Sequence, residues 1–212
     1  MRYNFPLSAK VTTGLSPWIG PSKNLHASWK SQDQESEISR TEFCVGTLPV
    51  GCQIKYMTEI AANSTQVSCT DCHVTNNGTY YISIRVTNGA GLFTVMTTTG
   101  VTVDLTAPYL GEIVPQFYVT SCTSNCTLLS NITSVEDGES GIRLCSFAIR
   151  NSTDFLTDFI GNGLSMIVKA TGLLLVPGQS YFTLVRCENN VGLIAESLSS
   201  AVTVDDTPPS KV

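Results

Sequence analysis

Residues 78–92, with the sequence Gly-Thr-Tyr-Tyr-Ile-Ser-Ile-Arg-Val-Thr-Asn-Gly-Ala-Gly-Leu, decide the fold of this chain. The residues that fall two apart in this stretch are Tyr80, Ile82, Ile84, Val86 and Asn88. Residues two apart share one face of a β-strand. The stretch therefore predicts one strand with an apolar inner face, ended by a glycine-rich turn.

The same pattern returns in residues 178–193, with the sequence Gly-Gln-Ser-Tyr-Phe-Thr-Leu-Val-Arg-Cys-Glu-Asn-Asn-Val-Gly-Leu. Tyr80 matches Tyr181, and Asp104 matches Asp205. The period is roughly 100 residues, which is the size of one β-sandwich domain. The repeat predicts two tandem units, at residues 1–107 and 108–212, of which the first strand of the first unit is the least defined.

Composition excludes several classes of protein. Apolar residues make up 42% of the 212 residues, enough for a buried core, while charged residues are only 14%. The net charge of −5 offers no basic patch for nucleic acid. No apolar run approaches the roughly 18 residues that a membrane-spanning helix needs. We therefore expect no nucleic-acid partner and no membrane insertion within this chain.

Cysteines and glycosylation sequences indicate the compartment. The chain has 8 Cys, and Asn-x-Ser/Thr sequences occur at Asn63, Asn77, Asn125, Asn131 and Asn151. Together they favour an oxidising, glycosylating environment, outside the cell or at its surface. The first residues lack the continuous apolar stretch of a signal peptide. We therefore expect this chain to be a piece of a longer protein, in which a further repeat would follow.

Alternation and turn residues predict strands along both units and almost no helix. In the first unit the expected strands cover residues 9–13, 25–29, 38–45, 53–58, 67–74, 80–88 and 93–103. In the second they cover residues 128–132, 142–149, 164–174, 181–188 and 202–204. Residues 153–160 suit a helical turn, a strand or a loop equally. The fold class expected is all-β.

The ordered set of motifs resembles a tandem pair of fibronectin type III domains. Residues 25–29, Leu-His-Ala-Ser-Trp, resemble that family's second strand, whose Trp fills the core. Residues 78–80 resemble the turn into its sixth strand, where a Tyr hydroxyl anchors the corner, and residues 88–91 resemble its Asn-x-Ala-Gly ending. Residues 137–142 and 204–209 are similar to a variant found in long arrays of extracellular animal proteins. The resemblance implies two tandem immunoglobulin-like β-sandwiches.

The second unit departs from that pattern, because Ile132 stands where the first has Trp29. Its core must be weaker or repacked around the smaller side chain. The immunoglobulin-type pairing of cysteines around a Trp is also absent from the sequence pattern.

Strand parity places two cysteines of the second unit on its inner face. Cys145 shares parity with Phe147, and Cys187 shares parity with Tyr181 and Val185. In the fold that the resemblance implies, the start of the third strand lies beside the end of the sixth. A Cys145–Cys187 disulfide therefore fits.

The other six cysteines have closer neighbours in sequence. Cys44 faces outward and could meet Cys52 across the loop that contains Pro49. Cys69 could then form a local disulfide with Cys72, and Cys122 with Cys126. Sequence alone does not determine connectivity, so these pairings stay open at this point.

Metal binding is the less favoured interpretation of two groups of residues. Cys69, Cys72 and His73 could supply zinc ligands, but a single Cys-x-x-Cys without a second pair is a weak signal. A thioredoxin-like redox role is weaker still, because the Cys-x-x-Cys does not stand at the start of a helix. The acidic turns could bind calcium; they contain Asp33, Glu35, Glu37, Asp104, Asp137, Glu139, Asp205 and Asp206. Solvated turns in which Asp caps its own backbone are favoured, because no EF-hand spacing occurs. We expect no metal and no cofactor.

Catalysis is not expected either. A nucleophilic Ser or Cys needs a base within reach, and the only histidines are His26, expected to point out of its strand, and His73. No glycine-rich phosphate loop precedes a helix. Tyr80 and Tyr181 are interpreted as core corner residues, and Trp18 as packing under the first strand.

The expected function is that of a non-catalytic extracellular structural or adhesive module. It would be part of a longer repeat-containing cell-surface or matrix protein and would mediate protein-protein contacts or spacing. Its partners would be other extracellular proteins or neighbouring repeats of the same chain. The alternative is an accessory ectodomain region of a larger receptor or secreted enzyme whose active domain lies outside this chain.

Overall fold

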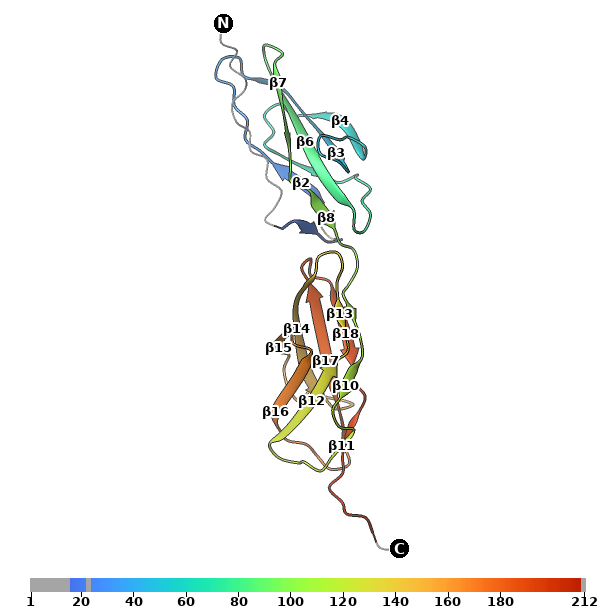
Figure 1. Cartoon of the computed structure of the whole chain (residues 1–212). Coiled ribbons are helices and arrows are strands. Elements are labelled where there is room, and N and C mark those ends of the chain that lie inside the picture. The colour runs from blue at the N-terminus through green and yellow to red at the C-terminus, as the bar shows by residue number, and fades with distance from the viewer. Residues whose placement is uncertain (1–15, 22–23, 211–212) are drawn as a thin grey trace. The chain divides into compact units, whose positions relative to one another are not determined.

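The structure, a computed structural model, describes residues 16–21 and 24–210 (Figure 1). All regular elements within these residues are β-strands, so the predicted all-β class is confirmed. No helix of the described residues has the length and apolar character needed to span a membrane. The chain divides into two compact units, Met1–Leu105 and Thr106–Val212, a boundary two residues before the expected one. The strand expected at residues 9–13 lies outside the described residues.

The first unit is a sandwich of a large and a small sheet. The large sheet has the order β1-β8-β6-β3-β4, with β7 also paired to β6, and the small sheet pairs β2 with β5. The strands are β1 (Trp18–Ile19), β2 (Leu25–Ser28), β3 (Ile38–Gly46), β4 (Lys55–Ile60), β5 (Gln66–Cys69), β6 (Thr79–Asn88), β7 (Phe93–Thr97) and β8 (Val101–Val103). All pairs are antiparallel except β1 with β8.

The second unit repeats this plan with a larger second sheet. One sheet has the order β11-β19-β17-β14-β15, with β18 paired to β17, and the other has the order β10-β12-β16. The strands of the unit begin with β9 (Tyr109–Leu110), β10 (Ile113–Pro115), β11 (Val119–Thr120), β12 (Cys126–Ile132), β13 (Val135–Glu136) and β14 (Ile142–Arg150). They end with β15 (Ile160–Gly163), β16 (Ile167–Leu173), β17 (Ser180–Asn189), β18 (Ile194–Leu198) and β19 (Val202–Val204). β9 and β13 form a separate two-stranded pair.

The predicted alternation holds on β6 and β17, the long strands of the two units in Figure 1. On β6, Tyr80, Ile82, Ile84 and Val86 are all buried in the first core. On β17, the matching positions include Tyr181, Val185 and Cys187, which lie in the second core. Each unit therefore has its own core, built on the inner face of one long strand.

Backbone bonds show which residues occupy matching positions. The Trp29 amide donates to the Thr65 carbonyl at 2.8 Å, and the Ile132 amide donates to the Met166 carbonyl at 2.8 Å. Both side chains are buried in their cores. Ile132 thus takes the place of Trp29, as expected from the sequence.

Several predicted strand limits were wrong for identifiable reasons. The strand expected at residues 93–103 is split into β7 and β8, because the Thr98 hydroxyl accepts the Ile82 amide at 2.9 Å and interrupts the ladder. The strand expected at residues 67–74 ends at Cys69, where the bond to Cys72 turns the chain. Residues 153–160 form no helix; Phe155 pairs with Arg150 in an isolated bridge.

Candidate functional site

The cysteines of the structure form four disulfides, and none is free. The pairs are Cys44–Cys52, Cys69–Cys72, Cys122–Cys126 and Cys145–Cys187. They are the Cys145–Cys187 pair that the sequence favoured and the three local pairs that it had left open. Three of them close short loops, with sequence separations of 8, 3 and 4 residues, whereas the fourth spans 42 residues.

The long bridge joins neighbouring strands inside the second core. Cys145 on β14 faces Cys187 on β17 in register, and their Cα atoms are 4.1 Å apart. Both residues are buried among the side chains of the core cluster. The bridge is therefore a structural link, shielded from solvent.

The Cys44–Cys52 bridge folds a loop onto the outer face of β3. Cys44 points away from the inward Phe43 and Val45, as expected, yet it is fully buried. The covering loop comes close to β3, because a side chain at Gly46 would meet the Gly51 carbonyl. This loop closes part of the outer face of the first unit.

The Cys69–Cys72 pair and Asp71 lie together, and this is the one described group that includes two of the expected zinc ligands. Both sulfurs are bonded to each other, so neither is free to bind metal in the oxidised chain. His73 is not part of the group. Lys55 Nζ lies 2.6 Å from Asp71 Oδ2, and this bond lowers the pKa of the Asp71 carboxyl. The cluster serves as a turn with a surface ion pair.

The two tyrosine corners are present in the geometry that the resemblance implied. The Thr75 amide donates to the Tyr80 hydroxyl at 2.9 Å, and the Val176 amide donates to the Tyr181 hydroxyl at 2.9 Å. Both tyrosines are buried in their cores. Each hydroxyl therefore satisfies a backbone amide five residues earlier in the chain, which fixes the turn into β6 or β17.

An Asp–Asn pair ties together two loops in each unit. In the first, Asn88 Nδ2 donates to Asp33 Oδ2 at 3.0 Å, and in the second, Asn189 Nδ2 donates to Asp137 Oδ2 at 3.0 Å. The other oxygen of each Asp accepts a nearby backbone amide at 2.8 Å, from Ser36 or from Ser140. These contacts make Asp33 and Asp137 caps of their own loops.

The five glycosylation sequences lie at different places. Asn63, Asn77, Asn125 and Asn151 are in loops or turns, whereas Asn131 is on β12. Asn77 and Asn125 have φ angles of 60° and 53°, a conformation that asparagine tolerates. The side chain of Asn151 is half-buried, and the other four are exposed. All five therefore reach the surface.

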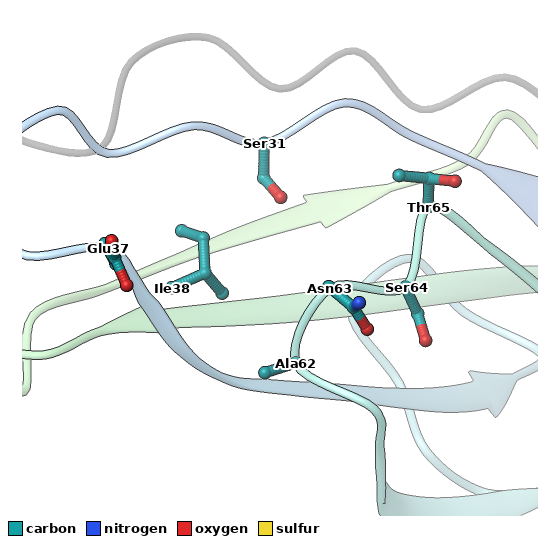
Figure 2. Close-up of a pocket in the computed structure, with 7 residues that line it drawn as sticks. All are labelled: Ser31, Glu37, Ile38, Ala62, Asn63, Ser64 and Thr65. Carbon is teal, nitrogen blue, oxygen red and sulfur yellow. The ribbon is translucent and has the colours of Figure 1, made fainter.

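A hollow of the first unit lies beside one of these sequences (Figure 2). Figure 2 shows Ser31 on one segment facing Asn63, Ser64 and Thr65, which follow one another in a loop. The remaining lining residues are Glu37, Ile38 and Ala62. Among the residues that the structure describes, Glu37 is the one titratable side chain of this lining.

The residues considered for catalysis are not assembled. His26 is exposed on β2, as expected, and its Nδ1 lies 2.9 Å from the Ser68 hydroxyl. No carboxylate is bonded to that ring among the described residues, so the pair lacks the orienting third group of a nucleophilic site. His73 is also exposed. Trp18 forms part of β1 and is half-buried; the strand it was expected to cover lies outside the described residues.

The outer faces of both large sheets carry an arginine beside an aromatic ring, Arg85 at 5.8 Å from the Phe93 centroid in the first unit and Arg186 near Phe159 in the second. They differ in the charged partner of that arginine, which sequence parity did not reveal. In the first unit, the buried Glu42 carboxylate binds Arg40 at 2.7 Å and Arg85 at 2.6 Å. In the second, Arg186 lies 4.2 Å from the ring centroid of Phe159 and 2.6 Å from Glu196. Arginine and aromatic side chains are frequent at protein contacts.

No protein-family model matches this sequence, and no curated protein matches it. Solved structures do match. A structure concerning host cell surface retention of a 1.5-MDa bacterial ice-binding adhesin is 15% identical, over 96% of this chain and 67% of that chain, with a TM-score of 0.55. Domains A168–A170 of titin are 15% identical, over 94% of this chain and 68% of that chain, with a TM-score of 0.52. Fibronectin(III)-like modules of Clostridium thermocellum CbhA are 11% identical, over 97% of this chain and 99% of that chain, with a TM-score of 0.47.

The adhesin and titin structures, whose TM-scores exceed 0.5, carry this comparison. At these identities the likeness concerns the fold. The fold of this chain is accordingly that of tandem fibronectin type III-like, immunoglobulin-like sandwiches, as the sequence motifs indicated.

Proposed function

We propose that this chain is a non-catalytic extracellular module that spaces and presents surfaces for contact with other proteins, within a longer adhesive, matrix or cell-surface protein. The observation that carries the proposal is the pairing of every cysteine into a disulfide. Disulfides persist in oxidising compartments and are rare in the cytosol. The five surface asparagines in Asn-x-Ser/Thr sequences support the same location, because they would carry sugars there.

The polar groups of the described residues support a role in structure. The buried tyrosine hydroxyls, Tyr80 and Tyr181, bind backbone amides. The acidic turns bind their own loops through Asp33 and Asp137. These hydroxyls and carboxylates stabilise the sandwiches through hydrogen bonds to the backbone. A catalytic role would require them to contact a substrate.

The outer faces support a role in contacts. Fibronectin type III-like sandwiches bury their inner faces and leave loops and outer faces for partners. Both units offer arginine beside an exposed aromatic side chain, Arg85 with Phe93 at 57% exposed in the first and Arg150 with Phe155 at 53% exposed in the second. The expected partners are other extracellular proteins or neighbouring repeats of the same chain.

The compartment can be tested by secreting the 212-residue chain from animal cells with a cleavable leader. Peptide mapping without reduction should recover all four pairs, and glycopeptide analysis should find sugars on the exposed asparagines. Free thiols at all eight positions, together with unmodified asparagines, would contradict an extracellular role. The chain made in a reducing cytosol is the control, because it should unfold at a lower temperature.

A further inference from the structure

The outer face of the sheet β10-β12-β16 is apolar around Asn131, although the exposed Lys169 lies further along β16. Inner and outer residues alternate along β12, so Leu128, Ser130 and Ile132 are buried while Leu129 and Asn131 point outward. On the flanking strands, Val114 and Ile167 lie directly across from Asn131. Ile167 is 58% exposed.

The first unit shows what the same face looks like when it is open to water. Its small sheet pairs His26 with Ser68 and Ser28 with Gln66. The matching pairs of the second unit are Leu129 with Lys169 and Asn131 with Ile167. An antiparallel sheet with one solvated face is normally polar on that face, as it is in the first unit.

Asn131 lies at the centre of this apolar face. It is on the middle strand of three, and its cross-strand neighbours on both sides are apolar. Its side chain is exposed and makes no hydrogen bond within residues 16–21 and 24–210. Thr133 completes the acceptor sequence, while the intervening Ile132 points into the core.

We propose that Asn131 carries an N-linked sugar that lies over Val114, Leu129 and Ile167 and shields this face. The inference rests on the proposed function, because it needs a glycosylating compartment. Asn131 Nδ2 bonds to the anomeric carbon of a sugar held on a lipid diphosphate. The carbon–oxygen bond to the diphosphate breaks, the amide loses one proton, and the lipid diphosphate leaves.

The chemistry of the occupant fits the face. The ring of a pyranose has an apolar C–H surface that packs on aliphatic side chains, while its hydroxyls remain in water. The other four sequences lie in loops or turns, where a sugar would extend from the end of an element. Asn131 alone among the five is placed on a strand, so its sugar has apolar side chains on both sides.

The test uses the full secreted chain and two variants that remove the acceptor, N131Q and T133A. Glycopeptide analysis measures occupancy of each asparagine. Sedimentation and binding of an apolar dye then measure exposure of the face. N63Q is the matched control, because it removes a loop sugar. I167Q is added to N131Q as a rescue, because it copies Gln66 of the first unit.

We expect Asn131 to be occupied, and both N131Q and T133A to self-associate roughly tenfold more tightly than the parent, since one Ile-sized patch becomes free to bury. N131Q/I167Q should return to the parent behaviour, and N63Q should not differ from it. Sugars on the other asparagines with Asn131 bare would overturn this inference and leave the proposed function standing. It is equally overturned if N131Q behaves as N63Q does. All five asparagines bare would overturn both.

Discussion

Trp29 and Ala27 lie in the core of the first unit, whereas the second unit has Ile132 and Ser130 at the matching positions. Ser130 is buried, and its hydroxyl lies 3.0 Å from the hydroxyl of Thr183, also buried. The first unit has Ile82 where the second has Thr183. The second core therefore replaces an apolar contact with a hydrogen-bonded pair, which adds less net stability than apolar burial.

The second unit gains a covalent link in return. Thr41 and Val86 form the cross-strand pair of the first unit that matches Cys145 and Cys187. A disulfide stabilises a domain chiefly by constraining the unfolded chain, more so for long loops. The comparison teaches that one sandwich plan is held by apolar packing in one unit and by a long cross-link in the other.

The largest effect is expected from exchanging that pair. C145T/C187V, which copies the first unit, should lower the free energy of unfolding of the second unit by about 4 kcal/mol, the entropy expected for a loop of this length. Urea denaturation followed by circular dichroism measures it. Both tryptophans lie in the first unit, so tryptophan fluorescence reports that unit separately. Breaking the Cys69–Cys72 bridge is the control and should cost about 2 kcal/mol; equal losses would contradict the comparison.

A smaller loss is expected from separating the buried hydroxyls. S130A leaves the Thr183 hydroxyl buried without its partner, which should cost the second unit about 2 kcal/mol. S130A/T183V removes both hydroxyls and should recover most of that loss. If the double variant were as unstable as S130A in the same urea experiment, the hydrogen bond between the two hydroxyls would not be what offsets the cost of burying them.

The tyrosine corners should respond alike in the two units. Y80F and Y181F each remove the acceptor of one backbone amide and should cost about 1 to 2 kcal/mol. Thermal unfolding of each variant checks this, with tryptophan fluorescence reporting the first unit and dichroism reporting both units together, so that a transition seen by dichroism alone belongs to the second. An effect in one unit alone would mean that the shared hydrogen bond has different roles in the two sandwiches.

The smallest effect is expected on the stability of the first unit at acidic pH. The Asn88 amide, and next the Ser36 backbone amide, lower the pKa of Asp33 below its usual value of 3.8. Because the folded-state pKa is depressed, this stabilisation is present above the unfolded value and is lost as pH falls through the folded one. Below pH about 4, the first unit should therefore lose stability more steeply in the parent than in D33N. Parallel pH profiles of the fluorescence-detected melting temperature would contradict this role.

The sequence predicted the features that depend on one strand at a time. Alternation on β6 and β17 placed the core residues, and parity placed Cys145 and Cys187 on the inner face. The tyrosine hydroxyl bonds followed from the resemblance and are confirmed.

Features that depend on a partner strand could not be predicted in this way. The strand β15 has the sequence Ile-Gly-Asn-Gly, which lacks alternation and forms only against β14, with a register shift. The split between β7 and β8 requires the Thr98 hydroxyl to capture a neighbouring amide. The burial of Cys44 requires its own loop to fold back over it. Each is a consequence of pairing that no local pattern records.

The Cys145–Cys187 bridge also limits how far the second unit can lengthen under tension. A chain pulled from its two ends extends by roughly 3.3–3.6 Å per residue released. The bridge, with a separation of 42 residues, holds back roughly 140 Å of contour. The bridges of the first unit, with separations of 8 and 3 residues, hold back only roughly 40 Å. On unfolding under tension, the first unit would therefore gain more length than the second.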